Sequence, residues 1–174
     1  GHELTRSHDT LYPFRQSSDF LHLSAWQGPK ARLILHPKGD ILFVPRIDDH
    51  HRLWVGDIPS PSMLRSTYRF KRVLYLDQFP ETFCSLSKSA DSVCAPRPLH
   101  SELRSLQPDL TIKIMKGSLA HRELRCFKNR YEVLLLQKIS DISSQAHIET
   151  ISSIQPGQKE FQVQGVFESH LFQH

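Results

Sequence analysis

The chain has 174 residues, of which 39% are hydrophobic and 23% are charged. This composition is typical of a globular protein that is long enough for one full domain and part of another. No apolar run approaches the ~20 residues that a membrane-spanning helix needs, so we expect no membrane partner. The net charge of +4 comes from scattered Lys and Arg residues, a distribution that argues against nucleic acid as a partner.

The cysteines and the N-terminus point to an intracellular protein. Cys84, Cys94 and Cys126 are odd in number and include no Cys-x-x-Cys pair. This pattern indicates reduced thiols rather than a disulfide framework or a zinc knuckle. The N-terminus carries no basic segment followed by an apolar one, as a secretory signal would. We therefore expect a cytoplasmic location.

The first two thirds of the chain alternate strand-like and helix-like segments. Residues 20–24 alternate apolar and polar side chains, which predicts a half-buried strand. Residues 31–36 and 40–45 are β-prone runs separated by a Pro-Lys-Gly-Asp turn, which predicts a hairpin. The remaining predictions are strands at 72–77, 110–115 and within the 85–98 loop, and helices at 48–56, 60–68, 77–88 and 101–107. Such alternation predicts an α/β fold.

The pattern changes after about residue 118 to one of long helices. Asn129 followed three residues later by Glu132 is an N-cap signature for a helix over 129–154. Its expected apolar stripe contains Leu135, Ile139, Ile142 and Ala146, and a second amphipathic helix from Gln158 carries Phe161, Val166 and Leu171. Two such helices have little to pack on. We therefore predict a first domain at 1–117 and the truncated start of a second domain at 118–174.

The sequence Asp48-Asp49-His50-His51 could supply metal ligands. Adjacent side chains do not converge on one ion without ligands from elsewhere, so we favour the solvated start of a helix, where acidic residues suit the helix dipole. His121 and His147 lack the His-Glu-x-x-His spacing, and we interpret both as surface or half-buried histidines. The chain also lacks Gly-x-Ser-x-Gly and glycine-rich phosphate-binding motifs. We therefore assign no catalytic residue and no metal ligand to it.

Two further features allow more than one interpretation. Arg15, Gln16 and Asp19 are polar residues flanked by aromatic ones. Because buried polar groups need partners, we favour a structural network that fixes a loop against the sheet, with substrate contact as the alternative. Trp54, close to Gly56, is either a core residue or an exposed aromatic wall for a partner.

Several of these stretches together resemble one family. "YPFRQSSDFLHLSAW" and "LFVPRIDDHHRLWVG" are similar to the N-terminal domain of the Xaa-Pro peptidases, which include aminopeptidase P and prolidase, with creatinase as a relative. "LRCFKNRYEVLLLQKISDISSQAHIETISSIQPGQKEFQVQGVFE" resembles the segment between the domains and the first two helices of the "pita-bread" catalytic domain. "LFVPR" and "ISSQAH" favour the prolidase branch. Ser24-Ala25 replaces the family's usual Thr-Gly.

The resemblance implies a mixed β-sheet flanked by helices, in a domain that supports a homodimer and shapes the substrate entrance. It implies a parent enzyme that hydrolyses the bond before proline in proline-containing peptides. In that family, two metal ions, usually Mn²⁺ but also Zn²⁺ or Co²⁺, are bound by Asp, Asp, His, Glu and Glu downstream of these helices. We therefore expect this chain to be inactive alone and to hold no cofactor. Trp54 aligns with a tryptophan that reaches the substrate pocket of a neighbouring subunit.

Two alternatives within the same fold stay open. The fold also occurs in non-catalytic domains that bind peptides or histones, and fold alone does not establish function. A creatinase-like enzyme would instead act on creatine or another non-peptide substrate. A salt-sensitive pull-down with histones would favour the first alternative.

Overall fold

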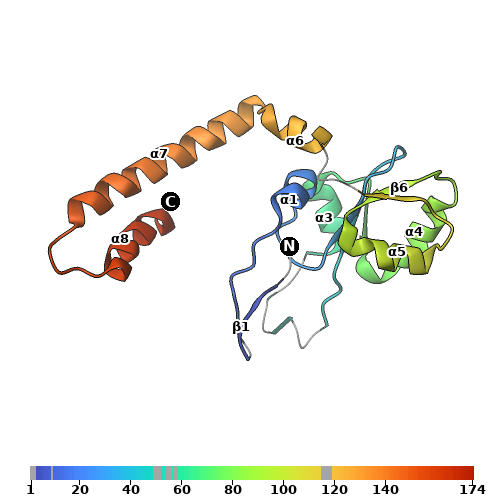
Figure 1. The fold of residues 1–174 in the computed structure, drawn as a ribbon, viewed down its shortest axis with the longest axis horizontal. Coiled ribbons are helices and arrows are strands. Elements are labelled where there is room, and N and C mark those ends of the chain that lie inside the picture. The colour runs from blue at the N-terminus through green and yellow to red at the C-terminus, as the bar shows by residue number, and fades with distance from the viewer. Residues whose placement is uncertain (1–2, 9, 49–51, 54–55, 57–58, 115–118) are drawn as a thin grey trace. The chain divides into compact units, whose positions relative to one another are not determined.

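The computed structural model describes residues 3–8, 10–48, 52–53, 56, 59–114 and 119–174. The chain divides into two compact units, Gly1–Gly117 and Ser118–His174 (Figure 1).

The first unit contains short strands and helices in alternation. Its strands are β1 (Thr5–Ser7), β2 (Thr10–Leu11), β3 (Arg32–Ile34), β4 (Ile41–Val44), β5 (Arg72–Tyr75), β6 (Val93–Ala95) and β7 (Ile112–Ile114). Its α-helices are α1 (Ser18–Ser24), α3 (Pro61–Tyr68), α4 (Phe79–Ser87) and α5 (His100–Leu106), and the 3₁₀ turns are η1 (Leu76–Gln78) and η2 (Arg97–Leu99). The predicted helices at 60–68, 77–88 and 101–107 are thus confirmed, as are the strands at 72–77 and 110–115.

The central sheet is mixed. Its strand order is β3-β4-β5, with β3 antiparallel to β4 and β5 parallel to it. β3 and β4 form the predicted hairpin, whose turn contains Gly39 at a φ of 126°. β6 and β7 form a separate parallel pair, and β1 and β2 an antiparallel one. The sheet and its helices confirm the predicted α/β fold class.

Both faces of β4 are buried, because helices cover the sheet on both sides. Ile41 and Phe43 point into a core that is shared with α4, whereas the alternate residues, Leu42 and Val44, point into a second core. The partners of β4 are Phe79 and Phe83 in the first core, and Trp26, Leu64 and Val73 in the second. Because successive side chains of a strand face opposite ways, one short strand supplies two cores. Parallel pairing of this kind requires cover on both faces.

The prediction of a strand at 20–24 was wrong, because these residues form α1. Phe20 and Ser24 lie one helical turn apart on the inner side, and the Ser24 hydroxyl donates a hydrogen bond to the Phe20 carbonyl at 2.6 Å. Leu21, which a strand would have placed inside together with Leu23, is 38% exposed. Ala25 adopts a left-handed conformation, with a φ of 55°, and ends the helix. A run of only five residues is too short for the spacing of its apolar side chains to distinguish a strand from a helix.

The helix predicted at 48–56 falls largely outside the described residues. Arg52 and Leu53 are helical. The Arg52 N–H donates to the Asp48 carbonyl at 3.0 Å, and the Gly56 N–H donates to the Arg52 carbonyl at 3.1 Å. Asp49, His50, His51 and Trp54 lie outside the described residues.

The second unit consists of α6 (Leu119–Cys126), α7 (Arg130–Ser153) and α8 (Glu160–Phe172). The predicted cap of α7 is confirmed: the Asn129 side chain accepts hydrogen bonds from the Tyr131 and Glu132 N–H groups at 2.9 and 3.0 Å. Glu132 in turn accepts from the Asn129 N–H at 2.8 Å. α8 returns along the C-terminal half of α7 (Figure 1), where Ala146 and Thr150 are buried.

Candidate functional site

No metal-binding cluster occurs in the part of the chain that the structure describes: no three His, Cys, Asp or Glu side chains are grouped there to hold an ion. Asp49, His50 and His51 lie outside that part, so our interpretation of them as a solvated helix start stays a prediction. The side chain of His121 also lies outside it. His147 is exposed, and its ring centroid lies 4.8 Å from that of Phe167.

The polar stretch before α1 is organised around Gln16. Its side chain is buried, and its amide Nε2 donates a hydrogen bond to the Gly28 carbonyl at 2.9 Å. Its Oε1 accepts one from the Ser17 N–H at 2.9 Å, where Ser17 precedes the first turn of α1. Gln16 therefore joins the entry of the helix to the loop that follows it, twelve residues along the chain.

The same loop is fixed by Trp26. Its backbone N–H donates to the Ser24 hydroxyl at 3.1 Å, and its side chain is 5% exposed within the core of Leu42 and Val44. Gly28 packs against the indole ring, because a Cβ atom at this position would lie 2.8 Å from Trp26 Cζ2. The hydrogen bonds of Gln16 and the packing of Trp26 thus hold α1 and its loop against the sheet.

Arg15 and Asp19 differ from Gln16 in burial, because both are exposed. Asp19 lies in the first turn of α1, where a negative charge suits the helix dipole. The three residues are therefore not buried together. Whether Arg15 and Asp19 take part in a network with Gln16, or in contact with a substrate, stays a prediction.

We expect Gln16→Ala to lower the free energy of unfolding of the first unit by about 1–3 kcal/mol, because it removes a buried amide and leaves the Gly28 carbonyl without its donor. Arg15→Ala is the matched control at an exposed neighbour, with an expected change within about 0.5 kcal/mol. Chemical denaturation followed by Trp fluorescence measures both. Equal effects of the two substitutions would contradict the central role of Gln16.

Trp54, for which the family resemblance implies a place at a substrate entrance, lies outside the described residues. Its assignment to core packing or to a partner surface stays a prediction.

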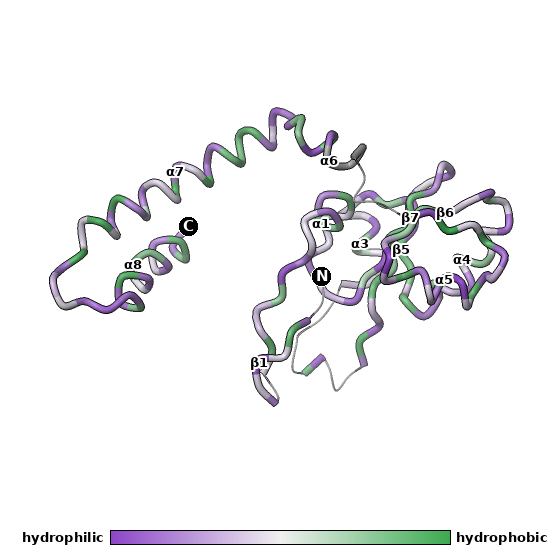
Figure 2. The backbone as a smooth tube through the Cα atoms, in the orientation of Figure 1, coloured by the Kyte–Doolittle hydropathy of each residue, from purple (hydrophilic) through white to green (hydrophobic). Residues whose placement is uncertain are grey.

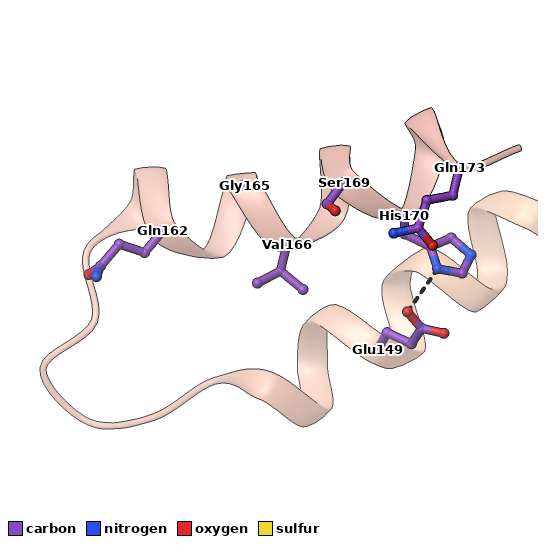
Figure 3. Close-up of a pocket in the computed structure, with 7 residues that line it drawn as sticks. All are labelled: Glu149, Gln162, Gly165, Val166, Ser169, His170 and Gln173. Carbon is purple, nitrogen blue, oxygen red and sulfur yellow. Dashed lines mark hydrogen bonds and ion pairs between the residues drawn. The ribbon is translucent and has the colours of Figure 1, made fainter.

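An open hollow lies along α8 in the second unit, and Figure 3 shows the residues that line it. They are Glu149 from α7 and Gln162, Gly165, Val166, Ser169, His170 and Gln173 from α8. Val166 points toward α7, whereas Glu149 reaches from α7 to the His170 ring (Figure 3). The Glu149 Oε2 atom lies 2.8 Å from His170 Nδ1.

The carboxylate of Glu149 has a second partner on its own helix. Gln145, one turn earlier, donates a hydrogen bond to Glu149 Oε1 at 3.2 Å. The hydrogen bond from Gln145 and the contact with His170 stabilise the charged form, and they hold the pKa of Glu149 below its usual value. This pair could not be recognised in the sequence, because Glu149 and His170 lie 21 positions apart on different helices.

The N-terminal half of α7 has a large exposed apolar surface, and Figure 2 shows hydrophobic residues recurring along the helix. Of the predicted stripe, Ala146 is fully buried, but Leu135 and Ile139 are 59% and 53% exposed. Other apolar residues in this half with at least half of their surface exposed are Tyr131, Val133, Leu134 and Leu136. A helix that is apolar on several faces is normally covered by other structure.

The helices in the described ranges include none with the length and apolar character needed to cross a lipid bilayer.

Comparison with known proteins identifies the first unit. Residues 1–94 match the family described as "Aminopeptidase P, N-terminal domain". A probable Xaa-Pro aminopeptidase of Talaromyces marneffei is 29% identical over 168 residues, which cover 94% of this chain and 36% of the relative. A probable Xaa-Pro aminopeptidase of Penicillium rubens is 30% identical over 166 residues, which cover 92% of this chain and 36% of the relative. The chain therefore spans about a third of the length of these relatives.

Solved structures agree on the fold. Zinc-substituted aminopeptidase P of Escherichia coli, in complex with product, superposes with a TM-score of 0.87 at 22% identity, covering 100% of this chain and 44% of that one. Proline aminopeptidase P II of Yersinia pestis gives a TM-score of 0.83 at 23% identity, with the same coverage. These relatives are aminopeptidases, whereas two short motifs had favoured the prolidase branch. Since the family match covers more than half of its residues, this chain belongs to the aminopeptidase P N-terminal domain family.

Proposed function

We propose that this chain is the N-terminal, non-catalytic part of a metal-dependent Xaa-Pro aminopeptidase, an enzyme that hydrolyses the peptide bond before proline. The observation that carries the proposal is the family match over residues 1–94, with Xaa-Pro aminopeptidases aligned along 94% of this chain. The kinship with aminopeptidases favours this proposal over a peptide- or histone-binding module and over a creatinase-like enzyme.

The catalytic metal ions of such an enzyme, expected to be two Mn²⁺ ions, need a cluster of carboxylate and imidazole ligands. The described residues do not fit this requirement, because no three such side chains are grouped among them. We therefore assign no step of peptide hydrolysis to these residues. In this proposal, the metal ligands belong to further polypeptide, in the two thirds of the relatives' length that this chain does not cover.

The exposed apolar surface of α7 supports such an arrangement. Leu135 and Ile139 expose more than half of their surface to water, which is unfavourable by about 25 cal/mol for each Å² of apolar area. In this proposal, the catalytic part of the enzyme covers them. The domain of residues 1–117 would support a homodimer and shape the substrate entrance, with Trp54 reaching the pocket of a neighbouring subunit.

Peptidase assays test the proposal. We expect the 174-residue chain, supplied with Mn²⁺, to hydrolyse neither an Xaa-Pro dipeptide nor a longer peptide that begins with Xaa-Pro. A longer polypeptide that also contains the expected catalytic part should release the N-terminal residue of the longer peptide. Manganese-dependent turnover by the chain alone would overturn the non-catalytic assignment. Absence of turnover by the longer polypeptide, together with binding of histone peptides, would favour the binding-module alternative.

A further inference from the structure

Glu149 and His170 form a polar contact between the two helices of the second unit. Glu149 lies on α7 and His170 on α8, and their Oε2 and Nδ1 atoms are 2.8 Å apart. The His170 side chain is 9% exposed, whereas that of Glu149 is 48% exposed. The histidine is thus enclosed by the helix pair, while its partner stays accessible to solvent protons (Figure 3).

The second ring nitrogen of His170 explains why the docking of α8 on α7 depends on the contact with Glu149. Nε2 is buried and has no hydrogen-bond partner among the described residues. If Glu149 stops accepting a hydrogen bond, both ring nitrogens are left unsatisfied inside the closed helix pair. An unsatisfied buried polar group is unfavourable, and separation of α8 from α7 would let water solvate both nitrogens.

Two further side chains lie next to the Glu149–His170 pair. On α7, Gln145 donates to Glu149 and is neutral at every pH. On the α8 side, the His174 ring centroid lies 4.9 Å from that of His170. Neither neighbour is acidic, so Glu149 is the carboxylate of this group that accepts from His170 Nδ1.

We propose that Glu149 and His170 form an acid-sensitive clasp, which keeps α8 docked along α7 at neutral pH and releases it when the medium becomes acidic. The clasp concerns the helix pair alone and does not depend on the proposed peptidase function. The pH range in which the clasp opens is set by the titration of the Glu149 carboxyl group. Since Glu149 has a lowered pKa in the folded helix pair, its contribution is complete above its ordinary pKa of 4.5 and is lost as the pH falls through the folded value.

Hydrogen exchange of the full chain between pH 3 and pH 7 tests the clasp. The quantity measured is the protection factor of the α8 amides, corrected for the intrinsic exchange rate at each pH and compared with the α4 amides as an internal reference. In the wild-type chain we expect α8 protection to fall on the order of threefold to fivefold more than α4 protection on acidification. Glu149→Gln removes the titrating charge, so its α8 protection should follow that of α4.

Glu168→Gln is the matched control. Glu168 also accepts a hydrogen bond from a glutamine one turn earlier, Gln164, at 2.7 Å, but this pair lies within α8. We expect Glu168→Gln to keep the wild-type profile. His170→Asn is a second test from the other partner and should remove the acid response as Glu149→Gln does. An acid response that persists in Glu149→Gln or His170→Asn, or that is absent from the wild-type chain, overturns the proposal.

Discussion

Replacing Phe43 with Ala is expected to lower the free energy of unfolding of the first unit by about 3–5 kcal/mol. Phe43 is fully buried in β4. Its ring meets that of Phe79 edge to face, with centroids 5.3 Å apart. The substitution therefore removes the ring contact between Phe43 and Phe79 of α4, and leaves a cavity that neighbouring side chains fill only in part.

Phe172→Ala is the control for this experiment. It deletes the same atoms at a position that is 87% exposed, so the expected change lies within about 0.5 kcal/mol. Urea denaturation of the two variants measures the difference, with Trp fluorescence as the reporter of the first unit, which contains both tryptophans of the chain. Equal midpoints for the two variants would show that the core between β4 and α4 does not stabilise this unit.

The second large effect is expected from substitutions in the apolar surface of α7, and its size depends on whether the catalytic part is present. In the 174-residue chain, the double substitution Leu135→Glu and Ile139→Glu should leave helix content and thermal midpoint almost unchanged, because both side chains are exposed. In a longer polypeptide with the catalytic part, the same substitutions would place two carboxylates in an apolar contact, at a cost of several kcal/mol. We expect that protein to lose Xaa-Pro hydrolysis and most of its folded fraction.

Lys138→Glu provides the control on the same helix, since residue 138 is already charged and exposed. It should change neither the short chain nor the activity of the longer one. Circular dichroism of the short chain and peptidase assays of the longer one give the comparison. If the double variant of the longer protein kept full activity, the surface around Leu135 and Ile139 would not be an interface with the catalytic part.

Local chemical signals in the sequence predicted several elements correctly. Ser60 followed by Pro61 predicted the start of α3, where Ser60 caps the helix. Asn129 and Glu132 predicted the start of α7, and both hydrogen-bond to the backbone there. Caps and turns of this kind depend on side chains within four residues of one another, so they can be read from the sequence without knowledge of the fold.

Structural features that depend on contacts between residues far apart in the chain were predicted less well. In α1, the five residues 20–24 matched both a strand and a helix, and the packing of Phe20 against the core of Trp26 and Leu42 decided between them. The sequence also grouped Arg15 and Asp19 with Gln16, but only Gln16 is buried. Its partner Gly28 becomes adjacent only when α1 and the following loop have folded.

The sequence by itself determined the α/β character of the first unit, the β3–β4 hairpin and the long capped helix α7, because periodicity, turns and caps are short-range properties. Only the tertiary structure decided that both faces of β4 are buried and that Glu149 meets His170 across two helices. It also showed that the predicted stripe of α7 is covered at Ala146 but open at Leu135. An amphipathic pattern marks which residues avoid water, whereas the packing of segments far apart in the chain decides which of them are buried.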